Sequence, residues 1–297
     1  MEPKKLFQVG RDSIIYSKKY WKQNKNGILN LSNKTPYIEF PTLQQIPFIK
    51  HGFSTRLGGV SKEHLASLNL SFIRNDEPEH VYMNYQRICD AIGIKIESLV
   101  FSDQVHDTKI HRVTKKNLTG KPFEKQGLKG IDGLVTDEPG VTLVTSYADC
   151  VPLFFVDTKE RAIGLSHSGW RGTVGRIGAK TVQTMKNEFG TNPENLIAVI
   201  GPSICQECYE VSKDVALQFE SEFLPEQIDS VLIKKENGKY QLDLWRANQI
   251  ILAEAGIPQE NISVAGICTC CNNGLLFSHR ASQGMRGNLN GFLQIVE

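Results

Sequence analysis

The sequence of 297 residues has little that would suit it to bind nucleic acid or a membrane. Its net charge is +2, from 34 basic and 32 acidic residues, which leaves no strong electrostatic footprint for either partner. The longest apolar runs, such as 151–156, are far below the roughly 20 residues of a membrane span. The N-terminal residues show no apolar stretch followed by a small-residue cleavage site, so no secretory signal is expected. These absences favour a small substrate.

A disulfide framework is also not expected. The cysteines number seven, which is odd, and the chain is large enough to fold without cross-links. We therefore expect free thiols, a reducing compartment and a cytoplasmic location.

Domain organisation follows from where the polar segments lie. Residues 1–36 are rich in lysine and asparagine and are predicted to be a variable N-terminal extension, with a peripheral ribbon or hairpin at 6–16. From residue 37 to residue 297 apolar segments alternate with turn residues, and no linker of proline and serine interrupts them. We expect one compact catalytic domain over 37–297.

Apolar periodicity predicts more strands than helices. Strands are expected at 99–101, 110–113, 133–136, 141–145, 153–156, 162–166, 196–200 and 262–267. A hairpin is expected from 231–235 and 240–244 around Asn237-Gly238, because this pair favours two positive φ angles. Helices are expected at 76–91, 173–189, 212–223 and 244–255 from caps, early prolines and terminal glycines. This mixture favours mixed sheets with helices over a doubly wound parallel sheet.

Three candidate metal ligands each close a short apolar segment. They are His106 in SDQVH, Cys150 in SYADC and His167 in GLSHSGWRG. Two imidazoles and a thiolate suit zinc or copper, and three protein ligands leave a fourth position for water or substrate. The alternative is that they are two structural histidines and a buried thiol.

Asp149, directly before Cys150, is a carboxylate in an otherwise apolar stretch. Burying such a group is costly unless it is paired or functional. Asp149 and Cys150 are therefore candidate catalytic residues.

Two glycine-rich segments are candidate phosphate sites. After His167, glycines 169, 172, 175 and 178 recur every third residue between a strand and a helix, and Arg171 and Arg176 lie among them. Backbone N–H groups and arginine forks in such a turn suit an anion. Neither GxxxxGK[ST] nor GxGxxG is present, and the alternative is a smooth face for close packing. The second segment is HGFSTRLGGVS, with Arg56 before a Gly-Gly turn; the alternative is an exposed turn.

Five late cysteines form Cys205-x-x-Cys208 and Cys268-x-Cys270-Cys271. CxxC is the usual zinc-knuckle spacing, whereas CxCC is a poor second knuckle. The sequence therefore favours an ordinary core here over a structural Cys₄ zinc site.

Several segments together resemble one family closely, from about residue 37 onward. They are HGFSTRLGGVS, QVH, DGLVTDEPGVTLVTSYADCVPLFFVD, AIGLSHSGWRGTVGRIGAK, IGPSICQECYEV, LDLWRANQIIL and CTCCNNGLLFSHR. Their order and content resemble the YfiH/YlmD family, also named the multicopper polyphenol oxidoreductase (laccase-like) family. The resemblance implies an α+β fold of mixed β-sheets layered with helices, in a single compact domain, and not a cupredoxin barrel.

The resemblance also implies the site and the activity. The family's metal ligands correspond to His106, Cys150 and His167. The implied activity is phosphorolysis of adenosine, inosine and methylthioadenosine, with adenosine deamination, and an older family label is copper-dependent polyphenol oxidation. One departure is the segment HRASQGMRGN, where family members commonly carry HRRDGGxTGR. His279 and Arg280 remain, and His279 is a candidate substrate-binding residue.

The expected cofactor is Zn²⁺, with Cu²⁺ as the alternative, and the expected ligands are a purine nucleoside and phosphate. Zinc would lower the pKa of a bound water toward neutrality, with Asp149 as proton shuttle for deamination. Arg56, Arg171, Gly169 and Gly172 would hold phosphate.

Three other functions stay open. One is copper oxidation, although seven histidines are few for the several coppers of a true laccase. The others are a cysteine hydrolase with Cys150 as nucleophile and a zinc-stabilised scaffold without activity.

Overall fold

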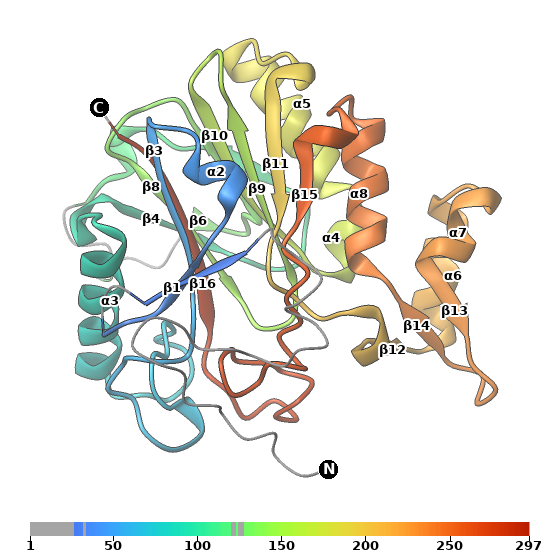
Figure 1. The fold of residues 1–297 in the computed structure, drawn as a ribbon, viewed down its shortest axis with the longest axis horizontal. Coiled ribbons are helices and arrows are strands. Elements are labelled where there is room, and N and C mark those ends of the chain that lie inside the picture. The colour runs from blue at the N-terminus through green and yellow to red at the C-terminus, as the bar shows by residue number, and fades with distance from the viewer. Residues whose placement is uncertain (1–26, 32–33, 120–122, 124–127, 297) are drawn as a thin grey trace.

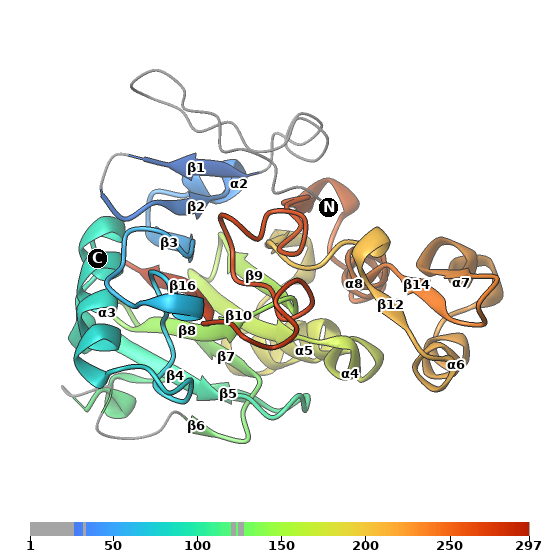
Figure 2. The same cartoon turned by 90° about the horizontal axis from the view of Figure 1, so that it is seen from below.

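The computed structural model describes residues 27–31, 34–119, 123 and 128–296 (Figure 1). The ribbon or hairpin expected at 6–16 lies outside these residues. Two large sheets face each other, and helices cover both outer faces, which gives four layers (Figure 2). The predicted α+β class with mixed sheets is confirmed, and no sheet in the described ranges closes into a barrel.

The first sheet has seven strands in the order β1-β2-β3-β16-β8-β4-β6. Their bounds are β1 Ile28–Asn30, β2 Tyr37–Glu39, β3 Ile49–Ser54, β16 Leu289–Ile295, β8 Thr142–Tyr147, β4 Leu99–Asp103 and β6 Leu128–Lys129. The pairs β8–β4 and β4–β6 are parallel and the others are antiparallel. The strand that comes last in the chain, β16, thus lies near the middle of the sheet.

The second sheet has six strands in the order β15-β11-β9-β10-β7-β5. Their bounds are β15 Ile262–Val264, β11 Leu196–Ile200, β9 Val151–Asp157, β10 Ala162–Ser168, β7 Gly133–Thr136 and β5 Ile110–Arg112. The pairs β11–β15 and β7–β5 are parallel. Every residue of β9 and β10 is buried, as expected for central strands covered on both faces.

Alternation along β9 places its side chains in two cores. Phe154 and Val156 pack between the sheets, against Leu143 of β8 and Leu293 of β16. Leu153 and its neighbours on the opposite face pack against the helices of the outer layer.

Most helices form the outer layers, while α6 and α7 belong with the small third sheet to a part that we call the peripheral unit, residues 205–242 (Figure 1). Their bounds are α2 Pro41–Gln44, α3 Pro78–Ile92, α4 Trp170–Val174, α5 Ile177–Phe189, α6 Lys213–Glu222, α7 Pro225–Val231 and α8 Leu244–Glu254. Short 3₁₀ turns are η1 Glu63–Leu65, η2 Ile96–Ser98, η3 Lys115–Asn117, η4 Pro193–Asn195, η5 Gln206–Cys208 and η6 Gln259–Asn261. Helix α3 covers the seven-stranded sheet, while α5 and α8 cover the six-stranded sheet. No helix in the described part of the chain is both long and apolar enough to cross a membrane.

A small third sheet lies beside α8, in the order β12-β14-β13 (Figure 1). Its strands are β12 Glu210–Val211, β14 Tyr240–Leu242 and β13 Leu232–Lys234. The hairpin expected around Asn237-Gly238 is present, with a φ of 76° at Gly238. Val211 and Leu242 join the core that contains α5 and α8. The single domain over 37–297 stays a prediction.

The continuous helix expected over 173–189 is wrong. The chain forms α4 and then α5, with Arg176 between them at a φ of 58°. Two glycines of this segment allow close packing. A Cβ on Gly175 would lie 2.6 Å from Thr108 Cγ2, and one on Gly178 would lie 3.0 Å from Leu252 Cδ2. Packing therefore accounts for these two members of the glycine repeat.

His51 of β3 predicts a pH-dependent stability. Its Nε2 accepts a hydrogen bond from the Phe40 backbone N–H at 2.9 Å, and burial lowers the pKa of His51 to about 4. The unfolded chain therefore takes up this proton first as the pH falls, and the contribution to stability is lost below the unfolded pKa. Between about pH 7 and pH 5 the free energy of unfolding should fall by about 2 kcal/mol from this residue.

Denaturant unfolding of the wild type and His51→Gln at both pH values measures this effect. The glutamine variant keeps a neutral acceptor and should lack this part of the pH dependence. Equal pH dependence in the two proteins would contradict the assignment.

Candidate functional site

Three of the predicted site residues meet where the chain crosses between the two large sheets. His106 lies in the loop from β4 to β5, Cys150 in the turn from β8 to β9, and His167 near the end of β10. Their nearest ligand atoms all lie within 4.8 Å of one another, and His106 Nε2 is 3.9 Å from Cys150 Sγ. His167 is buried, Cys150 is half-buried and His106 is exposed, so the cluster is open on one side.

The backbone around the cluster is locally constrained. His106 and Asp149 have φ angles of 62° and 88°, which residues with a side chain rarely adopt. A Cβ on Gly169 would lie 3.1 Å from Cys150 Sγ and 3.0 Å from His106 Cδ2. Gly169 thus lies at the cluster and leaves room for the two side chains, and its role in holding phosphate stays a prediction.

Asp132, which the sequence did not single out, holds the cluster together. The His167 side chain donates through Nδ1 to Asp132 Oδ1 at 2.8 Å, which points the other ring nitrogen, Nε2, toward Cys150. The same carboxylate accepts the backbone N–H groups of Val105, His106 and Asp107 at 3.0 Å each. Burial would raise the pKa of Asp132, but the hydrogen bonds from His167 and Val105 outweigh it and lower that pKa.

The charges within the cluster favour an ionised thiol. Burial would raise the pKa of Cys150, but His167 and His106 outweigh it and lower that pKa to about 6. Burial would lower the pKa of His167, but Cys150 and Asp132 raise it to about 9. A thiolate beside two imidazoles is suited both to bind a metal and to act as a nucleophile.

The donor set fits a zinc or copper ion. Zn–S and Zn–N distances of about 2.3 and 2.1 Å place the ligand atoms of a tetrahedral site about 3.6 Å apart. The observed 3.9 Å between Cys150 Sγ and His106 Nε2 is close to that value. A histidine ligand commonly donates its second N–H to a carboxylate, as His167 does to Asp132.

Asp149 anchors two loops. Its Oδ1 accepts from Thr269 Oγ1 at 2.6 Å, and its Oδ2 accepts from the Arg280 backbone N–H at 2.7 Å. The structure therefore shows Asp149 joining the turn that carries Cys150 to residues 269–280. Its role as a proton shuttle stays a prediction.

The residues predicted to bind phosphate make other contacts within the protein. The Arg56 Nε donates to Ala66 O at 2.8 Å and its Nη1 donates to Asn273 O at 2.9 Å, so this side chain ties loops together. Arg171 is exposed and stacks on Trp170, with 4.2 Å from its Cζ to the ring centroid. Gly172 packs against the His167 carbonyl, where a Cβ would lie at 3.2 Å.

A different pair of arginines lies beside the site. Arg286 Nη1 donates to Asn288 Oδ1, and Arg74 Nε donates to the same oxygen at 3.2 Å. Burial and the charge of Arg74 lower the pKa of Arg286 to about 10, while Asp149 and Cys150 act in the opposite direction. Arg286 Nε is buried without a hydrogen-bond partner in the described ranges. We call Arg74 and Arg286 the arginine pair.

His279, the remaining candidate, is exposed, and burial and the charge of Arg286 lower its pKa. It therefore lies in the electrostatic field of the arginine pair. Arg286 lies in the divergent HRASQGMRGN segment together with Arg280, and nothing in the spacing of that segment identified it.

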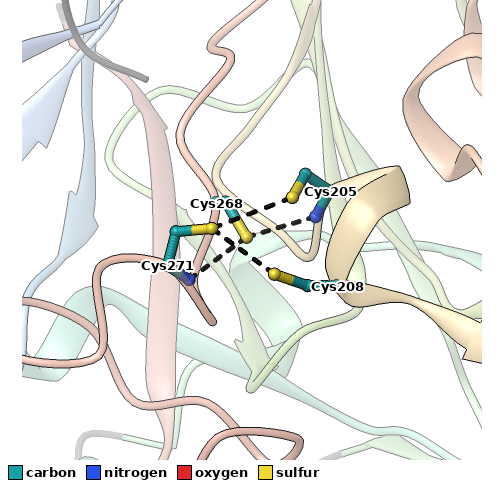
Figure 3. Close-up of side chains that lie close together, drawn as sticks. All are labelled: Cys205, Cys208, Cys268 and Cys271. Carbon is teal, nitrogen blue, oxygen red and sulfur yellow. Dashed lines mark hydrogen bonds between the residues drawn. The ribbon is translucent and has the colours of Figure 1, made fainter. Parts of the chain in front are cut away.

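Four of the late cysteines also meet, at a place where the sequence favoured an ordinary core. The sulfur atoms of Cys205, Cys208, Cys268 and Cys271 lie within 4.8 Å of one another (Figure 3). The pair that meets the first knuckle is Cys268 and Cys271, which has the CxxC spacing.

Comparison with known proteins gives consistent matches. Residues 50–296 match a family model described as multi-copper polyphenol oxidoreductase laccase. Purine nucleoside phosphorylase YlmD of Bacillus subtilis is 38% identical over 248 residues, which cover 83% of this chain and 88% of the relative. A protein named adenosine deaminase RL5, from an unknown prokaryotic organism, is 32% identical over 247 residues, which cover 80% of this chain and 93% of that protein.

A solved structure shares the fold. The crystal structure of YlmD from Geobacillus stearothermophilus superimposes with a TM-score of 0.85 at 33% identity, covering 91% of this chain and 100% of that chain.

Proposed function

Since this chain belongs to the multi-copper polyphenol oxidoreductase laccase family, we propose that it is a purine nucleoside phosphorylase with adenosine deaminase activity. The proposed substrates are adenosine, inosine and methylthioadenosine, cleaved by phosphate to the free base and the sugar 1-phosphate. The observation that carries the proposal is the cluster of His106, Cys150 and His167 beside the arginine pair. A reducing, cytoplasmic setting is part of the same proposal.

His106, Cys150 and His167 would hold the metal, proposed to be zinc. When bound, zinc supplies Lewis acidity and lowers the pKa of water, as deamination at C6 of adenine requires. Asp132 orients His167 and fixes the loop that carries His106. Asp149 stays the proposed carrier of the proton that leaves with ammonia.

Phosphorolysis requires that the phosphate be held near C1′ of the ribose. A phosphate oxygen bonds to C1′ while the bond to the purine nitrogen breaks, and the base leaves with that electron pair. We assign the phosphate first to the arginine pair, because Arg286 is partly buried, cationic and within the electrostatic reach of Cys150. Arg56, Arg171, Gly169, Gly172 and His279 stay proposed supporting residues.

A panel of nucleosides, incubated with and without phosphate and separated by chromatography, tests the function. Inosine should give hypoxanthine only when phosphate is present, and adenosine should give inosine without phosphate. A folded, zinc-bearing protein that turns over no nucleoside would favour the scaffold. Oxidation of phenols by the copper-loaded protein alone would favour the older family label.

A cysteine hydrolase is the second candidate, and one observation favours it. Cys150, His167 and Asp132 are arranged in the order nucleophile, base and orienting carboxylate. Activity that survives a chelator but not alkylation of the thiol would support the hydrolase. Activity lost with the chelator and restored by zinc would exclude it.

A further inference from the structure

The four clustered cysteines come from two loops that the sheet topology brings together. Cys205 and Cys208 follow β11, and Cys268 and Cys271 follow β15. Strands β11 and β15 are parallel neighbours, so the two loops that follow them start side by side at the carboxyl ends of the strands. The pairing continues beyond the strands, where Ser203 bridges Cys268 and the Thr269 N–H donates to Ser203 O at 3.1 Å.

The sulfur geometry is that of a tetrahedral thiolate site. Zn–S bonds of about 2.3 Å place the sulfurs of a Cys₄ site about 3.8 Å apart. Cys271 Sγ lies 3.4 Å from Cys208 Sγ and 4.0 Å from Cys205 Sγ, which brackets that value. No disulfide joins Cys271 to Cys205 or Cys208, since bonded sulfurs would be about 2.05 Å apart.

The backbone around Cys268 donates two hydrogen bonds to its sulfur. Cys268 is fully buried, and its Sγ accepts the N–H groups of Cys205 and Cys271 at 3.3 Å each (Figure 3). The donors come from both loops, and they fix the orientation of the Cys268 side chain. Hydrogen bonds around metal sites orient the ligands in the same way. Cys208 and Cys271 are half-buried, which leaves a path for an ion.

We propose that Cys205, Cys208, Cys268 and Cys271 bind one structural zinc ion, separate from the cluster at Cys150. Both pairs have the CxxC spacing, and four thiolates complete the coordination, so no position remains for a substrate. The ion cross-links the start of the peripheral unit to the loop that Thr269 and Arg280 tie to Asp149. Arg280 adds to this link by donating to Cys208 O at 3.1 Å and Glu210 O at 2.9 Å.

Metal content of the full chain, purified under reducing conditions, tests this site independently of the proposed function. In a Cys150→Ala background only the Cys₄ site should load, so the protein should carry one zinc per chain, and Cys271→Ser should remove it. Cys270→Ala is the matched control, since it removes the neighbouring thiol outside the four, and it should keep the zinc. Added chelator should lower the melting temperature of Cys150→Ala but not that of Cys150→Ala/Cys271→Ser.

Cobalt(II) provides a measurement that does not depend on the stability of the serine variant. The Cys150→Ala protein, loaded with Co²⁺ alone, should show the strong visible absorption of a tetrahedral tetrathiolate site at one equivalent. A Cys150→Ala protein without zinc and without this cobalt spectrum would overturn the proposal. A disulfide between Cys208 and Cys271 in the freshly purified protein would also overturn it.

Discussion

Replacing Cys150 by alanine is expected to lower kcat/KM for every nucleoside by about 10³-fold or more, which corresponds to about 4 kcal/mol of transition-state stabilisation. The thiol is the one anionic member of the three-residue cluster, with a pKa lowered to about 6 by the two histidines. Its loss removes one of the three ligands and the one that carries negative charge, so zinc should leave this site as well. Steady-state kinetics and zinc analysis of the same preparation measure both effects.

Cys89→Ala is the matched control for the thiol. Cys89 is also buried, but it lies in α3 within the core on the outer face of the seven-stranded sheet. Its removal should cost some stability and leave kcat/KM and zinc content unchanged. Turnover by Cys150→Ala within tenfold of the wild type would refute the placement of the reaction at this cluster.

The second large effect is expected for Asp132→Ala. Its carboxylate accepts hydrogen bonds from the His167 side chain and from three consecutive backbone N–H groups. In the variant all four donors would lose this acceptor. We expect the free energy of unfolding to fall by about 3–5 kcal/mol, because buried donors without a partner are costly. The affinity for zinc should fall by about 10- to 100-fold, because His167 loses its orienting partner. Denaturant unfolding and competition with a chelator measure these changes.

Asp157→Asn is a control that separates the loss of stability from the loss of zinc affinity. Asp157 is another fully buried carboxylate that accepts backbone N–H groups, here from Lys159 and Glu160, in the turn from β9 to β10. This variant should lose stability yet retain the zinc affinity of the wild type. If Asp132→Ala lost stability while its zinc affinity stayed the same, Asp132 would be a structural residue only.

The parts of the fold that local chemistry determines could be predicted. Pro78 and Gly93 bound α3 as expected, with Gly93 at a φ of 76°. Asn237-Gly238 forms its hairpin. The break at Arg176 could not be foreseen, because apolar spacing runs through it, and contacts with Thr108 and Leu252 determine the packing of the glycines on either side.

Only those residues of the candidate site that lie in short sequence motifs could be predicted. His106, Cys150 and His167 were found through short motifs. Asp132 opens the DGLVTDEPG segment, but the role of this carboxylate was not visible there, since its partners lie 25 to 35 residues away. The cysteine cluster depends on the parallel pairing of β11 with β15, which no local pattern reveals. The arginine pair joins residues 212 positions apart through Asn288, for the same reason.

The position of β16 has a consequence for synthesis of the protein on the ribosome. This strand pairs with β3 on one side and β8 on the other. The partners of β3 in β16 therefore lie more than 230 positions later in the chain. The seven-stranded sheet therefore cannot be completed until residues 289–295 have left the exit tunnel. Until then the nascent chain exposes two unpaired strand edges, which attract other chains. Assembly of the sheet is thus a late and slow step, for which we expect a need for chaperones.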